Sequence, residues 1–198
     1  EIQTQIREYL TSNDYIEFDT PMLHNNAGGA EATPFTTYVN DLDAEVYLRI
    51  APELYLKRLI TAGYSRVFEV GKCFRNESID TTHNPEFTML ELYEEYATYE
   101  DMMDIVESIY THVAEELYGS TEIEYNGETI DVSEWERITF DECIEQELGG
   151  SLEEYSQIEL REYLLDNGVE LDADLSYDEL LMEIFEEFIE DELGGPVF

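Results

Sequence analysis

Positive charge is scarce in this chain, which has 9 lysine and arginine residues against 49 aspartate and glutamate residues and a formal net charge of −40. Because charged side chains are seldom buried without a partner, most of these carboxylates are expected on the surface. Such a surface repels polyanions at low ionic strength. We interpret it as an adaptation to a salt-rich cytoplasm, where a Debye length of about 3 Å at 1 M screens the repulsion. A basic partner or a store of cations is the alternative.

Cysteine is also rare, since Cys73 and Cys143 are the only two. They lack the close spacing of a metal knuckle, so we predict two reduced thiols without a catalytic role. The sequence shows neither an apolar run long enough to span a membrane nor a signal peptide, which predicts a cytoplasmic protein with no membrane partner. A hydrophobic content of 43% with 15 tyrosines and 9 phenylalanines argues against a disordered acidic tail.

The 198 residues are enough for one sizeable core, and the sequence pattern predicts both helices and strands. Most of the acidic residues follow residue 100, where the only basic residues are Arg137 and Arg161. The predicted helices are Glu1 to Ser12, Pro52 to Thr61, Tyr99 to Tyr118, and segments near 139–147, 156–167 and 177–192. The predicted strands are 15–20, 36–39, 46–50, 67–74 and a second arm from Phe87, with a further hairpin over 123–132 that turns at Asn126 and Gly127.

The most informative segment is 67–97, VFEVGKCFRNESIDTTHNPEFTMLELYEEYA, which is typical of a strand, a polar loop and a second strand. Because side chains alternate along a strand, the second arm places five of them on one face. These are Phe87, Met89, Glu91, Tyr93 and Glu95. At about 3.3 Å per residue, the wall from Phe87 to Tyr93 is about 20 Å long. It has room for a nucleotide at one end and an amino acid at the other.

Four separated blocks resemble a known family, the class II aminoacyl-tRNA synthetases. The segments FRNE and THNPEFTMLELY resemble motif 2, in particular that of the lysyl-tRNA synthetases. Residues 18–23, FDTPML, resemble motif 1. Residues 27–35, AGGAEATPF, and 47–60, YLRIAPELYLKRLI, resemble the lysine-site loop and the helix entrance. Thr33 stands where the family usually has arginine, and Ser78 where it usually has glycine. Glycine reaches positive φ at lower cost than serine.

The resemblance implies an α+β fold, a class II synthetase-like antiparallel sheet flanked by helices and incomplete at both ends. It divides the partial catalytic domain, residues 1–198, into a motif 1 and motif 2 core at 1–100 and an acidic helical region at 101–198. The anticodon-binding barrel and motif 3 are expected to be absent from this chain. Motif 1 supplies dimer contacts in the family, so a homodimer is expected.

For ATP, the resemblance implies a catalytic arginine and four further contacts. Arg75 would hold the α-phosphate against the substrate carboxylate, because a guanidinium forks onto two oxygens and stabilises developing charge. His83 would contact the outer phosphates, Glu77 and Asn84 would hold the adenine end, and Phe87 would stack on the base. We assign no metal ligand in this chain, although Mg²⁺ is expected with ATP from ligands in segments that the chain lacks.

For the amino acid, the resemblance implies that Gly29 and Glu53 contact the α-amino group. Glu91 and Tyr93 together suit an ammonium group, which offers three donors and no acceptor. The implied function is activation of lysine to lysyl-adenylate and transfer to tRNA(Lys), as part of a longer enzyme, with the chain alone inactive. Two alternatives stay open, namely a synthetase-like ligase that lysylates a protein, and a non-catalytic truncated paralogue that serves as an interaction module.

Overall fold

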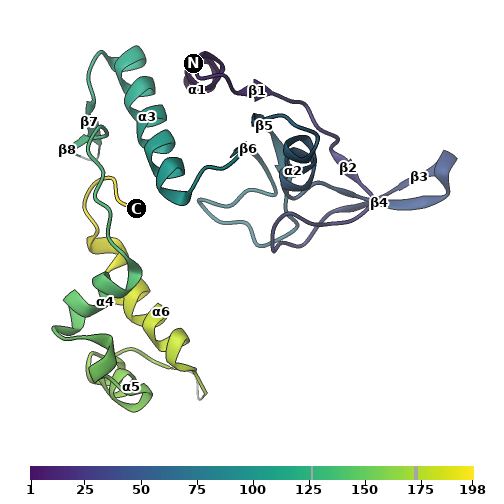
Figure 1. The fold of residues 1–198 in the computed structure, drawn as a ribbon. Helices are drawn as coiled ribbons and strands as arrows, with labels where there is room; N and C mark the ends of the chain where they lie inside the picture. The colour runs from purple at the N-terminus through teal and green to yellow at the C-terminus, as the bar shows by residue number, and fades with distance from the viewer. Residues whose placement is uncertain (126, 172–173) are drawn as a thin grey trace. The chain divides into compact units, whose positions relative to one another are not determined.

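The computed structural model describes residues 1–125, 127–171 and 174–198, with the elements drawn in Figure 1. The chain forms two compact units, Glu1–Leu117 and Tyr118–Phe198. In the described residues, no helix is both long and apolar enough to cross a membrane.

The first unit holds most of the strands, and its element boundaries follow the sequence pattern closely. In chain order its elements are α1 (Ile2–Ser12), β1 (Ile16–Glu17), β2 (Leu23–His24), β3 (Thr36–Val39), η1 (Asn40–Leu42), β4 (Ala44–Leu48), α2 (Glu53–Thr61), β5 (Arg66–Phe74), β6 (Glu86–Glu94) and α3 (Tyr99–Tyr118). The predicted strand at 15–20 is reduced to β1, and β4 begins and ends earlier than predicted. Strand β2 was not predicted.

The expected antiparallel sheet is confirmed only in part. Strands β5 and β6 pair antiparallel along their whole length, from Arg66 opposite Glu94 to Phe74 opposite Glu86. Strand β1, however, pairs parallel with β5, with Ile16 opposite Val67, so this three-stranded sheet is mixed. The parallel pairing is possible because the chain between β1 and β5 is long enough for a crossover. A second sheet, β2-β4-β3, is antiparallel throughout.

The β5–β6 hairpin separates a core face from an opposite face. Phe68 is fully buried in a cluster with Leu10 of α1 and Ile109 of α3, and Val70, Leu90 and Leu92 pack against the same cluster. Because side chains alternate, the other face carries Phe87, Met89, Glu91 and Tyr93, as predicted. Glu95 of the predicted wall lies outside β6. Helix α2 contacts both strands of the hairpin.

The second unit is a small helical body preceded by a short hairpin. Its elements are β7 (Glu122–Tyr125), β8 (Glu128–Asp131), α4 (Phe140–Leu148), η2 (Leu152–Glu154), α5 (Gln157–Asp166), α6 (Tyr177–Phe188) and η3 (Glu190–Glu192). Of the predicted turn, Gly127 has a positive φ and Asn126 lies outside the described residues. The predicted helix 177–192 ends at Phe188 and continues as η3. Helices α4, α5 and α6 each begin with a capping box, which defines their starts.

Candidate functional site

Arg75 follows directly after β5, where the hairpin opens into its loop. Its backbone N–H donates to the carbonyl oxygen of Pro85 at 2.9 Å, so the two ends of the loop are held together at this residue. Its guanidinium lies over the ring of Phe87, with the central carbon 5.2 Å from the ring centroid. The Nε of Arg75 is buried and has no hydrogen-bond partner among the described residues.

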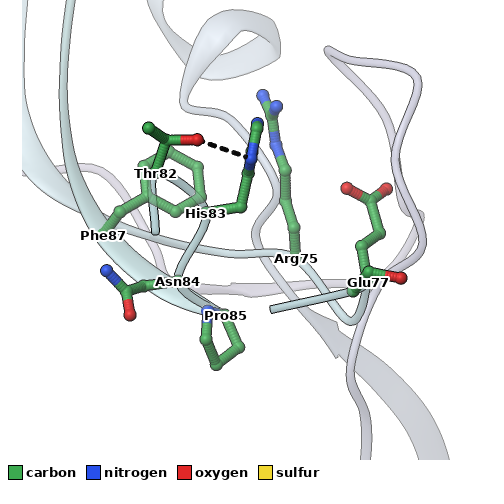
Figure 2. A pocket seen from close by; sticks show the side chains of 8 residues that line it. Arg75, Glu77, Thr82, His83, Asn84, Pro85 and Phe87 are labelled. Atoms are coloured by element: carbon green, nitrogen blue, oxygen red, sulfur yellow. Dashed lines mark hydrogen bonds between the residues drawn. The ribbon is translucent and has the colours of Figure 1, made fainter. Parts of the chain in front are cut away.

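A cavity of about 180 Å³ opens between Arg75 and the loop. Its lining residues are Arg75, Glu77, Ser78, Thr82, His83, Asn84, Pro85 and Phe87. All five residues predicted to contact ATP are thus brought together, while Ser78, Thr82 and Pro85 were not predicted. In Figure 2 the side chains of Arg75 and His83 extend in the same direction. Complete small-molecule sites have roughly 300–1,000 Å³, so this cavity fits part of a nucleotide.

The loop is organised around Asp80, which the sequence analysis missed. One carboxylate oxygen accepts the backbone N–H groups of Thr82 and His83, at 2.8 and 2.7 Å. The other lies 2.8 Å from Nδ1 of His83. These contacts lower the pKa of Asp80 to about 2, the two backbone N–H bonds having the largest effect. Since Asp80 engages Nδ1, the ring nitrogen Nε2 is the one left for a ligand. An aspartate three residues before a histidine was the available signal.

Thr33 and Ser78 differ from the arginine and glycine usual in the family, and the local backbone accommodates both residues. Thr33 donates its N–H to the Glu77 carboxylate at 3.0 Å and accepts the N–H of Asn76 at 2.7 Å. Any residue type except proline could make these bonds, and they tie the segment 27–35 to the hairpin loop. Ser78 is not among the described non-glycine residues with positive φ, so serine meets no left-handed strain there.

Gly29 and Glu53 are neighbours, as the resemblance implied. Gly29 has φ of 93°, and a Cβ added to it would lie 3.1 Å from the Cβ of Glu53 and 3.4 Å from that of Ala51. Only glycine combines this conformation with so close an approach to the first turn of α2. The Glu53 carboxylate is 2.8 Å from Nζ of Lys57, one turn further along the helix.

Glu91 and Tyr93 lie further along the same face of β6. The Tyr93 hydroxyl donates to the Glu91 carboxylate at 3.1 Å. Burial raises the pKa of Glu91; the neighbouring Glu53 adds to this rise, while the Tyr93 hydrogen bond and Lys57 oppose it. The Tyr93 pKa is raised as well, chiefly by burial. Nζ of Lys57 is 5.8 Å from the centroid of the Tyr93 ring. We name Glu53, Lys57, Glu91 and Tyr93 the acidic subsite.

A buried ion pair on this same face of the hairpin, where Glu69 lies directly opposite Glu91, was also missed. Arg49 is 1% exposed, and its Nη1 is 2.5 Å from the Glu69 carboxylate. Its Nε donates to the carbonyl oxygen of Lys72 at 2.7 Å, and its own carbonyl accepts the N–H of Phe74 at 2.9 Å. The second Glu69 oxygen accepts the hydroxyl of Thr20 at 2.6 Å. These bonds fix the last residues of β5, immediately before Arg75. An arginine inside an apolar strand pattern was the available signal.

Metal and thiol chemistry have little basis in the described residues. No group of three or more histidine, cysteine, aspartate or glutamate side chains there could hold a metal ion. Cys73 and Cys143 are both free and buried, and burial raises the pKa of each thiol. Neither cysteine is in a disulfide, as the prediction of two reduced thiols requires.

Comparison with known proteins confirms the class of protein that these motifs indicate. Residues 1–180 match the family of class II tRNA synthetases (D, K and N), and the chain belongs to that family. Over 196 residues it is 46% identical to the lysine--tRNA ligase of Staphylococcus aureus, and 45% identical to the lysine--tRNA ligases of its strains Mu3 and N315. Each alignment covers 98% of this chain and 40% of the relative. The chain therefore spans about 40% of the length of these relatives.

Proposed function

We propose that the chain is the ATP- and lysine-binding part of a lysine--tRNA ligase. One observation supports this most strongly, namely that a single face of β6 runs from Phe87, beneath the Arg75 guanidinium, to the Glu91–Tyr93 pair. The first end suits a nucleotide and the second suits an ammonium group. Lysine activation joins the two ligands, so one wall that holds both is what the reaction requires.

At the nucleotide end, the adenine would stack on Phe87 and be held by Glu77 and Asn84. His83 would contact the outer phosphates through Nε2, and Arg75 would bind the α-phosphate. A carboxylate oxygen of lysine then attacks the α-phosphorus, the bond to the departing pyrophosphate breaks, and lysyl-adenylate is formed. The Arg75 guanidinium would stabilise the charge that develops on the α-phosphate oxygens. Mg²⁺ is expected to accompany ATP.

At the amino-acid end, the lysine side chain would place its ammonium against Glu91 and Tyr93. The carboxylate accepts from the ammonium, and the Tyr93 hydroxyl already bonded to Glu91 fixes the carboxylate's direction. Glu53 and the backbone of Gly29 would hold the α-amino group, which their close approach supports. The lysyl group would then pass to the terminal ribose of tRNA(Lys), in the cytoplasm.

A homodimer through motif 1 is part of the proposal. Apolar side chains are exposed along α1, β1 and β2, and a second copy would cover them. They are Ile2, Ile16, Met22 and Leu23, each between 42% and 54% exposed. Sedimentation of the 198-residue chain tests this, since a monomer at micromolar concentration would contradict it.

The experiment for the function is lysine-dependent exchange of pyrophosphate into ATP, in a polypeptide of the relatives' length that contains this chain. Glu91→Gln removes the charge partner of the ammonium. It should reduce kcat/KM for lysine by an amount equivalent to about 2–4 kcal/mol. Glu86→Gln is the matched control, because Glu86 is on the same strand but exposed and paired with Lys72. Exchange that is equal in both variants would contradict the lysine assignment. Labelled lysine recovered on protein instead of tRNA(Lys) would favour the protein-lysylating alternative.

A further inference from the structure

The chain has only two lysines, and one of them stands inside the acidic subsite. Nζ of Lys57 lies 2.8 Å from the Glu53 carboxylate and 5.8 Å from the centroid of the Tyr93 ring. Lys57 thus brings an ammonium of the protein to the residues proposed to receive the ammonium groups of the substrate. No motif described above assigns a role to it.

The charges of the acidic subsite can be counted from its members. Glu53 and Glu91 contribute two carboxylates and Lys57 contributes one ammonium. Glu69, directly opposite Glu91 in the hairpin, is already paired with the buried Arg49. With its carboxylates ionised, the subsite therefore has a net charge of minus one. Free lysine, with two ammonium groups and one carboxylate, has a net charge of plus one.

We infer that Lys57 is a specificity-determining residue, whose ammonium balances one of the two carboxylates and tunes the subsite to an α-amino acid of single net positive charge. The competing ligand that Lys57 disfavours is a diamine, which has the same two ammonium groups but no carboxylate. Without Lys57 the subsite would have a charge of minus two and would suit a dication. This inference rests on the proposed function, because it takes the acidic subsite as the lysine site.

Lys57 discriminates through charge, since like charges that are brought together raise the free energy of the wrong complex. Its side chain is 57% exposed, so solvent screens the effect. We expect a change of about three- to fivefold in relative affinity, the size of a partly exposed charge interaction.

The test measures the dissociation constants of L-lysine and 1,5-diaminopentane for a polypeptide of the relatives' length that contains this chain, by ligand-observed NMR or calorimetry. Lys57→Gln removes the ammonium, and Lys57→Arg keeps a positive charge. Lys72→Gln is the matched control, since it removes the other lysine, whose Nζ pairs with Glu86 at 3.3 Å outside the acidic subsite. All proteins are compared at one salt concentration at which circular dichroism shows them equally folded.

The expected result is that Lys57→Gln raises the affinity for diaminopentane relative to lysine about three- to fivefold, while Lys57→Arg and Lys72→Gln keep the wild-type ratio. An unchanged ratio in Lys57→Gln overturns the inference and leaves the proposed function intact. Equal weakening of both ligands also overturns it, because Lys57 would then only position Glu53. Failure of the wild-type chain to bind lysine at all refutes the lysine site itself, and the inference with it.

Discussion

The Arg75 guanidinium covers the ring of Phe87, 5.2 Å from its centroid, and both side chains line the same cavity. An aromatic ring has two faces, so a cation on one face leaves the other for a nucleobase. The contact also limits the directions open to the long Arg75 side chain. Phe87 therefore has two roles in the proposed site, as a stacking surface for the base and as a support for the arginine that meets the α-phosphate.

Phe87→Leu should weaken ATP binding by about 1–3 kcal/mol, the usual contribution of one base–aromatic stack. Leucine keeps most of the apolar volume but offers neither a flat surface nor a partner for the guanidinium. Calorimetric titration with ATP gives the difference. Phe140→Leu is the control, because Phe140 packs against Phe185 in the second unit. Equal ATP affinities for the wild type and Phe87→Leu would remove Phe87 from the site.

As the pH falls, lysine binding should be lost at a higher pH than it would be if Glu91 titrated as an ordinary glutamate. Burial raises the pKa of Glu91 above its usual 4.5, and only the ionised carboxylate can pair with an ammonium. Binding is therefore complete above the raised pKa and is lost as the pH falls through it. Lysine titrations from pH 4 to 8 measure this limb, with Glu91→Gln as a reference whose weaker binding lacks it. A midpoint below 4.5 would contradict the prediction.

The raised pKa of Glu91 also affects the free energy of unfolding, and here its effect runs in the opposite direction with pH. Since the Glu91 pKa is raised in the folded protein, its contribution favours folding most below the unfolded pKa and is lost as the pH rises through the folded one. Glu91→Gln should therefore gain stability relative to the wild type as the pH rises from 4 to 7. Urea unfolding at the two pH values measures this gain. A gain that does not depend on pH would show that Glu91 has no raised pKa.

The hairpin and its two faces could be predicted because their signals are local. Alternation along 86–94 placed Phe87, Glu91 and Tyr93 together, and a polar loop marked the turn. A strand at 15–20 was predicted, but the parallel pairing of β1 with β5 could not be, since Ile16 and Val67 are distant in sequence and β1 has only two residues. The Arg49–Glu69 pair was missed for a related reason. Charged residues are normally read as surface, and although Arg49 stands in an apolar strand pattern, its partner Glu69 is 20 residues away and meets it only in the tertiary fold.

Gly71→Ala should destabilise the first unit by about 1–3 kcal/mol, as expected for overpacking. A Cβ at Gly71 would collide with Nη2 of Arg49 and lie 2.9 Å from a Glu69 oxygen. The buried pair would have to shift, and with it the end of β5 that carries Arg75. Urea unfolding measures the change. Gly194→Ala is the control, because a Cβ there meets no atom within 4 Å and its φ is not positive. Equal stability of the two variants would show that the pair can move freely.

The unfolding midpoint should rise steeply from 0.1 M to molar potassium chloride. With a net charge of −40, the folded chain repels itself, and salt at about 1 M shortens the Debye length to about 3 Å. Many carboxylates of the second unit are exposed, Glu186 and Glu187 of α6 among them. Neutralising both as Glu186→Gln/Glu187→Gln should therefore reduce the slope of the midpoint against salt. Gln146→Asn, which changes no charge, should leave the slope as it is. A midpoint that stays flat or falls with salt would contradict salt adaptation and favour a basic partner for the acidic surface.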